Sequence, residues 1–294
     1  MSLAFRTARD ADVLGIGLLG WRDRAVLRIL DRAEAATARQ LAVLAYGHRR
    51  VAQRRLARLW QAGLLERAVL PPAHRGGAEL AYRLSRRAQL QLGDRSTRAR
   101  GSSRLGHTLD IVEAVCALVT ASQDPRAWSP VRAWLTEPMA RTYLGGPPYP
   151  DSIVVLSDGQ RSGVICLEVD HATQRRAVIA AKLAAYRELR RSHPEWQTLL
   201  VVPSATRVRW LRWLFGSARD DLVTSTWITT LPALCSDHLA AAIVPIGGVR
   251  QGRAAVGDLL TYLGPRRSAT PVASSAWLQL TGEGGGEDRA DELT

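Results

Sequence analysis

The chain has 294 residues, a net charge of +13 and a hydrophobic share of 46%, which excludes a wholly disordered polypeptide. Its three widely spaced cysteines exclude a disulfide framework and a CxxC-type zinc site, so we expect a reducing compartment and a cytoplasmic protein. The only apolar run near the start, at 13–19, is too short to span a bilayer and follows acidic residues. We therefore expect no export signal and no membrane partner.

Positive charge is concentrated in the first third of the chain. Residues 1–104 contain 21 arginines and 8 acidic residues, a difference of +13, whereas residues 105–294 contain 19 basic and 19 acidic residues. If a GC-rich genome simply enriched the whole protein in arginine, the positive charge would be spread evenly along the chain, which is not the case here. A concentrated basic segment favours binding to a polyanion, because neutralised phosphates release counterions. We expect double-stranded DNA as a partner.

The first part of the chain has the pattern of a winged helix-turn-helix domain, which we place at 20–93. Apolar spacing predicts three helices and then two strands, at 21–35, 37–46, 48–62, 64–70 and 79–84. Thr37 opens the second helix, with Gln40 completing a capping box. In a winged helix the third helix enters the major groove of DNA, and the loop between the strands forms the wing.

The third predicted helix has one apolar face and one cationic face. Arginine and glutamine offer the paired donors that base edges and phosphates accept. The alternative is a solvated helix face, which is how most charged helix faces behave, but the charge asymmetry of the chain favours DNA contact. The side chains that we expect to contact DNA are Arg49, Arg50, Gln53, Arg54 and Arg58 on the helix, with His74 and Arg75 on the wing.

Beyond a polar linker at 94–104, strands alternate with helices over 105–264, which predicts an α/β domain. Its first helix, at 105–122, carries an isolated histidine and cysteine, His107 and Cys116, which we interpret as packing or capping residues. Gly-rich acidic residues at 281–294 predict a disordered tail. The other expected helices are 173–191 and 206–215, and the expected strands are 131–136, 153–156, 164–170, 198–202 and 222–229.

Three carboxylates and a lysine form the candidate site of this domain. Asp151 begins one predicted strand, and Glu168 and Asp170 close the next, where alternation puts both side chains on one face. Converging carboxylates need a counter-charge, usually a divalent cation. Lys182 on the next helix can lean back toward them. These are the ingredients of metal-assisted phosphodiester hydrolysis.

Lys182 is the only lysine among 40 basic residues. A compact ammonium can activate water or hold a phosphate oxygen in a way that a planar guanidinium cannot. The alternative is that Lys182 has no function and is retained by chance on a helix surface. Spacing alone does not separate these interpretations, and the neighbouring carboxylates favour the functional one.

The order of these motifs resembles the PD-(D/E)XK restriction-endonuclease superfamily. The shared features are a PD dipeptide ending at Asp151, an E-x-D closing the next strand from Glu168, and a helix that bears Lys182 and Tyr186. In this resemblance the superfamily lysine has moved from the strand to the helix. A nuclease-like fold is therefore implied for the second domain.

More narrowly, the chain is similar over 20–215 to the replication-relaxation family of plasmid and mobile-element proteins. The similarity rests on a winged helix, a helix with His107, and the segments PYPDSIVVL and CLEVDHATQRRAVIAAKLAAYREL. Members are implicated in plasmid replication and DNA relaxation, and relatives act as metal-dependent relaxases. The resemblance implies Mg²⁺ held by Asp151, Glu168 and Asp170, catalysis by these residues with Lys182, and Glu137 as an accessory carboxylate.

Two departures from the pattern keep alternatives open. His171 follows Asp170 where the family pattern has arginine, and the strand lacks its E-x-K lysine. A second hypothesis is therefore a non-catalytic DNA-binding regulator or replication accessory with a degenerate nuclease fold. A third is that the second domain binds a protein partner or a second copy of the chain as a homodimer. The sequence has neither a P-loop nor a dinucleotide fingerprint, so we expect no nucleotide cofactor.

Overall fold

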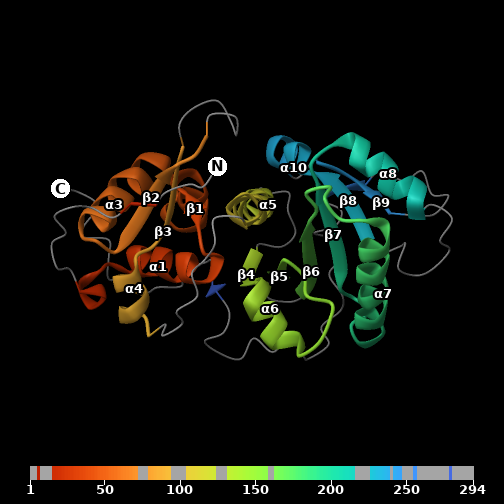
Figure 1. Cartoon of the computed structure of the whole chain (residues 1–294), viewed down its shortest axis with the longest axis horizontal. Coiled ribbons are helices and arrows are strands. Elements are labelled where there is room, and N and C mark those ends of the chain that lie inside the picture. Colours follow the sequence, from red (N-terminus) through yellow and green to blue (C-terminus); the bar gives the residue numbers. More distant parts are fainter. Residues whose placement is uncertain are drawn as a thin grey trace.

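The computed structural model has two regions of mixed helix and sheet with one long helix between them (Figure 1). A winged helix-turn-helix domain followed by an α/β domain gives the chain a predicted class of α+β, and the mixture of helices and sheets confirms this class. The predicted wing tip with His74 and Arg75, nearly all of the linker and the acidic tail lie outside the described residues. The structure describes residues 5–6, 15–71, 79–93, 104–123, 131–157, 162–215, 226–238, 241–246, 254–256 and 278–279.

The N-terminal region combines helices with a three-stranded antiparallel sheet of order β1-β3-β2. The three helices and two strands predicted here are confirmed, whereas β1 and α4 are too short to give a periodic pattern. The elements are η1 (Ile16–Leu18), α1 (Trp21–Ala33), β1 (Ala36–Thr37), α2 (Ala38–Leu41), η2 (Ala42–Tyr46), α3 (Arg49–Gln61), β2 (Leu65–Val69), β3 (Leu80–Leu84) and α4 (Arg86–Gln91).

The predicted capping box is present at the start of α2. The backbone N–H of Gln40 donates to Thr37 Oγ1 over 3.3 Å, and the backbone N–H of Thr37 donates to Gln40 Oε1 over 2.9 Å. The helix continues through the π-helical turn η2 to Gly47, whose φ of +74° suits a residue without a Cβ. The turn between the second and third helices is therefore fixed locally by sequence.

A buried carboxylate fixes α3 against α1. Asp23 is 5% exposed and accepts hydrogen bonds from Arg55 of α3, at 3.1 and 2.6 Å, and from the hydroxyl of Tyr46, at 2.8 Å. Burial and the charge of Asp23 raise the pKa of Tyr46, so its hydroxyl stays a donor. On the same face of α3, Leu56 and Leu59 are buried in the core. The opposite face of α3 is left to solvent.

The C-terminal region contains an eight-stranded sheet of order β10-β9-β8-β7-β6-β5-β4-β11. The pairings β6·β7 and β7·β8 are parallel, and the others are antiparallel. Predicted strands match β4 to β8, whereas β9 to β11 were not predicted. The strands are β4 (Val131–Thr136), β5 (Ser152–Ser157), β6 (Ser162–Val169), β7 (Gln197–Val202), β8 (Thr226–Thr230), β9 (Ala242–Pro245), β10 (Ala254–Ala255) and β11 (Leu278–Gln279).

Helices cover both faces of this sheet. Side chains of β6 alternate between two cores, with Ile165 and Leu167 facing α5 and α10, and Val164 and Cys166 facing α6, α7 and α8. The three predicted helices are confirmed as α5, α7 and α8, whereas α6 and α10 are additional. Their bounds are α5 (Leu105–Ser122), α6 (Glu137–Leu144), α7 (Arg176–Ser192), α8 (Ala205–Phe215) and α10 (Leu231–Asp237).

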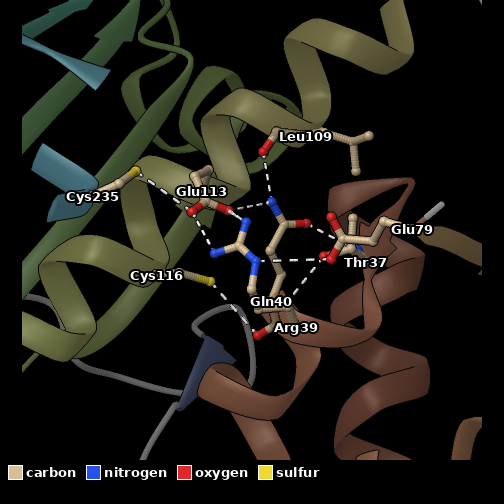
Figure 2. Close-up of polar contacts among 8 residues, drawn as sticks. All are labelled: Thr37, Arg39, Gln40, Glu79, Leu109, Glu113, Cys116 and Cys235. Carbon is tan, nitrogen blue, oxygen red and sulfur yellow. Dashed lines mark hydrogen bonds and ion pairs between the residues drawn. The ribbon is translucent and has the colours of Figure 1, made fainter. Parts of the chain in front are cut away.

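Helix α5 joins the two regions, because it packs on the sheet and also contacts β1, α2 and η2 (Figure 1). Polar contacts fasten this junction around the buried carboxylate of Glu113 (Figure 2). Arg39 and Gln40 of α2 donate hydrogen bonds of 2.7 to 2.9 Å to it, and Cys235 Sγ of α10 lies 3.5 Å from it. The two regions therefore share one continuous core.

Within the described residues, α5 is also the one helix with the length and apolarity to cross a membrane. Much of it is buried between the sheet and the N-terminal region, including Val115, Cys116 and Leu118. Its apolar composition is thus accounted for by its place in the protein core, and Cys116 is a packing residue as predicted.

Candidate functional site

The ends of β5 and β6 bring Asp151 and Glu168 close together. Asp151 immediately precedes β5, and the antiparallel register pairs Ser152 with Leu167, which puts Asp151 opposite Glu168. The backbone N–H of Val169 donates to Asp151 Oδ2 over 2.8 Å. The two carboxylates predicted from the sequence are therefore neighbours across the strand pair.

Helix α7 supplies a partner for each oxygen of Glu168. Lys182 Nζ donates to Glu168 Oε2, and the hydroxyl of Tyr186 donates to Oε1 over 2.5 Å. Ile179 and Leu183 bury the same side of α7 against the sheet, which directs Lys182 and Tyr186 toward the strand end. Glu168 is only 4% exposed, whereas the Lys182 side chain is 30% exposed and reaches solvent.

Burial and the charge of Asp151 raise the pKa of Glu168 to about 8. Burial also acts to raise the pKa of Asp151, but the hydrogen bond with His107 and the charge of Lys182 outweigh it, and that pKa is lowered. Burial acts against the charge of Lys182, yet the two carboxylates raise its pKa overall. The cluster thus separates two carboxyl groups by environment, with Asp151 the stronger acid.

Two histidines extend the cluster toward α5. His107 Nε2 lies 3.3 Å from Asp151 Oδ1, and His171 Nε2 lies 3.1 Å from Asp110 Oδ2. The two imidazole rings meet edge to face with centroids 4.9 Å apart. The hydrogen bond with Asp151 raises the pKa of His107. His107 therefore contacts Asp151 of the candidate site, which the packing or capping role predicted for it did not include.

Asp170 has a different partner. Arg207 Nε of α8 donates to Asp170 Oδ2 over 2.6 Å, and the backbone N–H of Ala172 donates to Oδ1 over 2.9 Å. Asp170 is 7% exposed and lines a small pocket together with Glu168 and Lys182. Among the described residues, no group of three or more His, Cys, Asp or Glu side chains is arranged to hold a metal ion.

A larger cleft of about 520 Å³ lies on the other side of Asp151 and His107, which both line it. Glu137, the expected accessory carboxylate, lies in the same lining and pairs with Arg141 over 2.9 Å. Glu137 and Asp151 therefore line the same cleft, but the carboxylate of Glu137 already has a cationic partner.

The predicted DNA-contacting face of α3 is exposed to solvent. His48 caps the helix, since the backbone N–H of Arg50 donates to its Nδ1 over 3.2 Å. Arg55 points the other way, into its ion pair with Asp23. The exposed side chains are Arg49, Arg50, Gln53, Arg54 and Arg58.

The chain is similar to a known protein family. A family model described as replication-relaxation matches residues 27–203, from within α1 to the end of β7. The matched range includes Asp151, Glu168 and Lys182 as well as α3. Neither a curated protein nor a solved structure matches the chain. Because the family model covers more than half of the residues, the chain belongs to the replication-relaxation family.

Proposed function

We propose that this protein binds double-stranded DNA through α3 and cleaves a phosphodiester bond at the strand-end site during replication or relaxation of a plasmid or mobile element. The proposal rests on the convergence of Asp151, Glu168 and Lys182 at the ends of β5 and β6. Membership in the replication-relaxation family supports the biological setting. It also agrees with the concentration of positive charge in the first third of the chain.

For DNA binding, the order of elements from α1 to β3, helices followed by two paired strands, agrees with the winged helix that we propose. Its third helix presents arginines and a glutamine to solvent while Leu56 and Leu59 hold the opposite face in the core. Such a face suits phosphates and the edges of bases in the major groove. We propose α3 as the recognition helix and the loop between β2 and β3 as the wing.

For cleavage, we propose a role for each side chain of the cluster, on the hypothesis that the second region is nuclease-like. Nicking adds water to phosphorus and breaks the bond from phosphorus to one sugar oxygen. Lys182 can offset the negative charge that develops on the phosphate, because its ammonium is a compact charge with access to solvent. His107, beside Asp151, can take the proton of the attacking water or deliver one to the departing oxygen.

The donor set of Asp151 and Glu168 fits Mg²⁺, which proteins commonly hold through one or two carboxylates together with waters and phosphate oxygens. Burial, and then the charge of Asp151, raise the pKa of Glu168, so a cation bound nearby would favour the ionised form of this carboxyl group. A bound Mg²⁺ would polarise a phosphate oxygen and acidify a water molecule. Asp170 is less suited to the same role, since Arg207 already neutralises it.

A second candidate function is a non-catalytic replication accessory. It is favoured by one observation, that all four carboxylate oxygens of Asp151 and Glu168 already have partners within the chain. In that case the cluster ties the strand ends to α5 and α7, and the protein acts through DNA binding alone.

The deciding experiment incubates supercoiled plasmid with the full chain and Mg²⁺. The proposal expects open circles from the wild type, and none from Asp151→Asn, Glu168→Gln or Lys182→Met, with duplex affinity unchanged in all three. Glu188→Gln is the matched control, because it alters an exposed carboxylate on the same helix, α7. In the described part of the chain, the ion-pair partner of this carboxylate is Arg191. If the wild type leaves plasmid supercoiled while binding it, the accessory function replaces the proposed one.

A further inference from the structure

The cleft beside Asp151 is bounded by three parts of the chain that are distant in sequence. They are the C-terminal end of α1, the start of α5, and β4 with the α6 helix that follows it. Each part contributes one arginine to the lining, namely Arg32 of α1, Arg104 at the N-cap of α5 and Arg141 of α6. The cleft therefore exists only because α5 docks the N-terminal region against the sheet.

The charges of the cleft are partly matched inside it. Glu137 pairs with Arg141, which also stacks over the ring of Tyr149 at 4.1 Å. Asp151 has His107 as its partner. Arg104 is exposed and forms no ion pair with any residue in the described part of the chain. An anion entering the cleft would therefore meet a guanidinium that has no ion-pair partner among the described residues.

Thr136 provides an independent indication of a ligand. It lines the cleft at the end of β4 and is 7% exposed, and its hydroxyl oxygen has no hydrogen-bond partner among the described residues. It precedes α6 as the N-cap residue, yet its side chain does not cap that helix. A buried hydroxyl without a partner costs free energy, and a hydrogen-bonding group of a ligand in the cleft would offset that cost.

The start of α5 adds to the attraction for anions. This 18-residue helix has neither a side-chain cap nor an acidic residue in its first turn. The first backbone N–H groups of α5 receive no side-chain cap from its N-cap residue, and with the positive end of the helix dipole they lie near Arg104 and Thr108, which line the cleft. Phosphate is the anion that this combination of donors fits best.

We infer that the cleft binds one strand of DNA separated from its complement, with phosphates on Arg104 and the start of α5 and a base against Ile111 and Pro138. A volume of about 520 Å³ is in the range of pockets for small ligands, so it takes a few nucleotides at most and excludes a duplex. This inference rests on the proposed function and deepens it. One separated strand of the duplex bound by α3 would then lie in the cleft, next to Asp151.

The test measures binding of a fluorescein-labelled short oligothymidylate to the full chain by anisotropy, without divalent metal, and compares it with binding of a duplex. Arg104→Ala should weaken single-strand binding by about tenfold, as expected for the loss of one charge-assisted hydrogen bond. Duplex binding should stay as in the wild type. Arg132→Ala is the matched control, because Arg132 is exposed at the opposite end of β4.

Thr136→Val separates a binding role from a structural one. Replacing the unpaired hydroxyl with a methyl group should leave the melting temperature of the free protein equal or higher, while single-strand affinity falls several-fold. Unchanged single-strand affinity in both Arg104→Ala and Thr136→Val would overturn the inference, as would a parallel loss of duplex binding. Since neither assay involves cleavage, failure of plasmid nicking would count against the proposed function and not against the cleft.

Discussion

Arg39 of α2 donates two hydrogen bonds of 2.7 Å to the carboxylate of Glu113, which is buried in the middle of α5 (Figure 2). The pair joins the region that carries α3 to the region that carries the carboxylate cluster. Gln40, the residue that completes the capping box of α2, donates to the same carboxylate and to the carbonyl oxygen of Leu109. One short helix start therefore serves both local capping and long-range attachment.

Arg39→Ala should lower the free energy of unfolding by about 2 kcal/mol, because it leaves a buried carboxylate without its main counter-charge. The loss is smaller than for a fully buried pair, since the Arg39 side chain is 38% exposed. Urea unfolding followed by circular dichroism measures it. Arg191→Ala breaks an exposed pair with Glu188 and should change stability by less than about 1 kcal/mol. Equal effects of the two substitutions would contradict a structural role for Arg39.

The free energy of unfolding should depend on pH through Glu168. Its pKa is about 8 in the folded protein and near the ordinary 4.5 in the unfolded chain. Between these values the unfolded state releases a proton that the folded state keeps, so stability falls as pH rises, by up to about 1.4 kcal/mol per pH unit. Glu168→Gln removes this component. Without divalent metal, the free energy of unfolding of the variant should therefore increase relative to that of the wild type as pH rises. The difference should become constant above about pH 8.

Glu188→Gln should run parallel to the wild type over the same pH range, because its carboxylate is exposed. A constant difference between Glu168→Gln and the wild type would show that Glu168 ionises normally in the folded chain.

Tyr186→Phe should shift the pH dependence of plasmid nicking. The hydroxyl of Tyr186 donates to Glu168 and lowers its pKa, so its removal raises that pKa further. If ionised Glu168 is needed for cleavage, the acid limb of the pH-rate profile moves to higher pH while the plateau rate is kept. Tyr143→Phe, whose ring stacks on Trp196 away from Glu168, should leave the profile in place. A drop in rate at every pH would assign Tyr186 a purely structural role.

Arg207→Met should destabilise the protein by about 3 kcal/mol, because Asp170 stays buried without a cation. Thermal unfolding with and without Mg²⁺ distinguishes two roles of Asp170. A structural carboxylate predicts that Mg²⁺ does not restore stability, and Asp170→Asn combined with Arg207→Met should recover part of the loss. Full recovery by Mg²⁺ would instead support Asp170 as a metal ligand.

Arg50→Ala and Arg54→Ala should weaken duplex binding and reduce the slope of log affinity against log salt by about 1 for each phosphate contact that is lost. Filter binding or anisotropy at several salt concentrations measures both quantities. Arg28→Ala, which removes an exposed arginine from α1 in the same region, is the control. If all three variants behave alike, the basic character of the region, and not α3, accounts for affinity.

Short-range patterns explain why much of this fold could be predicted. The alternation of β6 correctly put Glu168 and Asp170 on the face of α7, and the spacing of Ile179 and Leu183 turned Lys182 toward them. The capping box at Thr37 likewise depends on residues three apart. The strands β1 and β9 to β11 are too short to show such periodicity, so tertiary packing, and not the local sequence, determines where they form.

Contacts between segments that are distant in the chain could not be predicted from the sequence. Arg207 lies in α8, with α7 and β7 between it and Asp170, and nothing in the local pattern of either residue specifies the other. The contact of His107 is hidden in the same way, because its partner Asp151 follows only after two further elements. The spacing of His107 and Asp110 on one helix face was a signal, since both imidazole pairs of the site involve that face.

The placement of α5 has a consequence for where a strand would be cut. Because α5 packs against both regions and shares one core with them, the exposed arginines of α3 and the cleft beside Asp151 belong to one packed unit. If the proposed binding and nicking are correct, this packing fixes the spacing between the two sites. Each nick would then fall a constant number of bases from the bound sequence, whatever bases lie between.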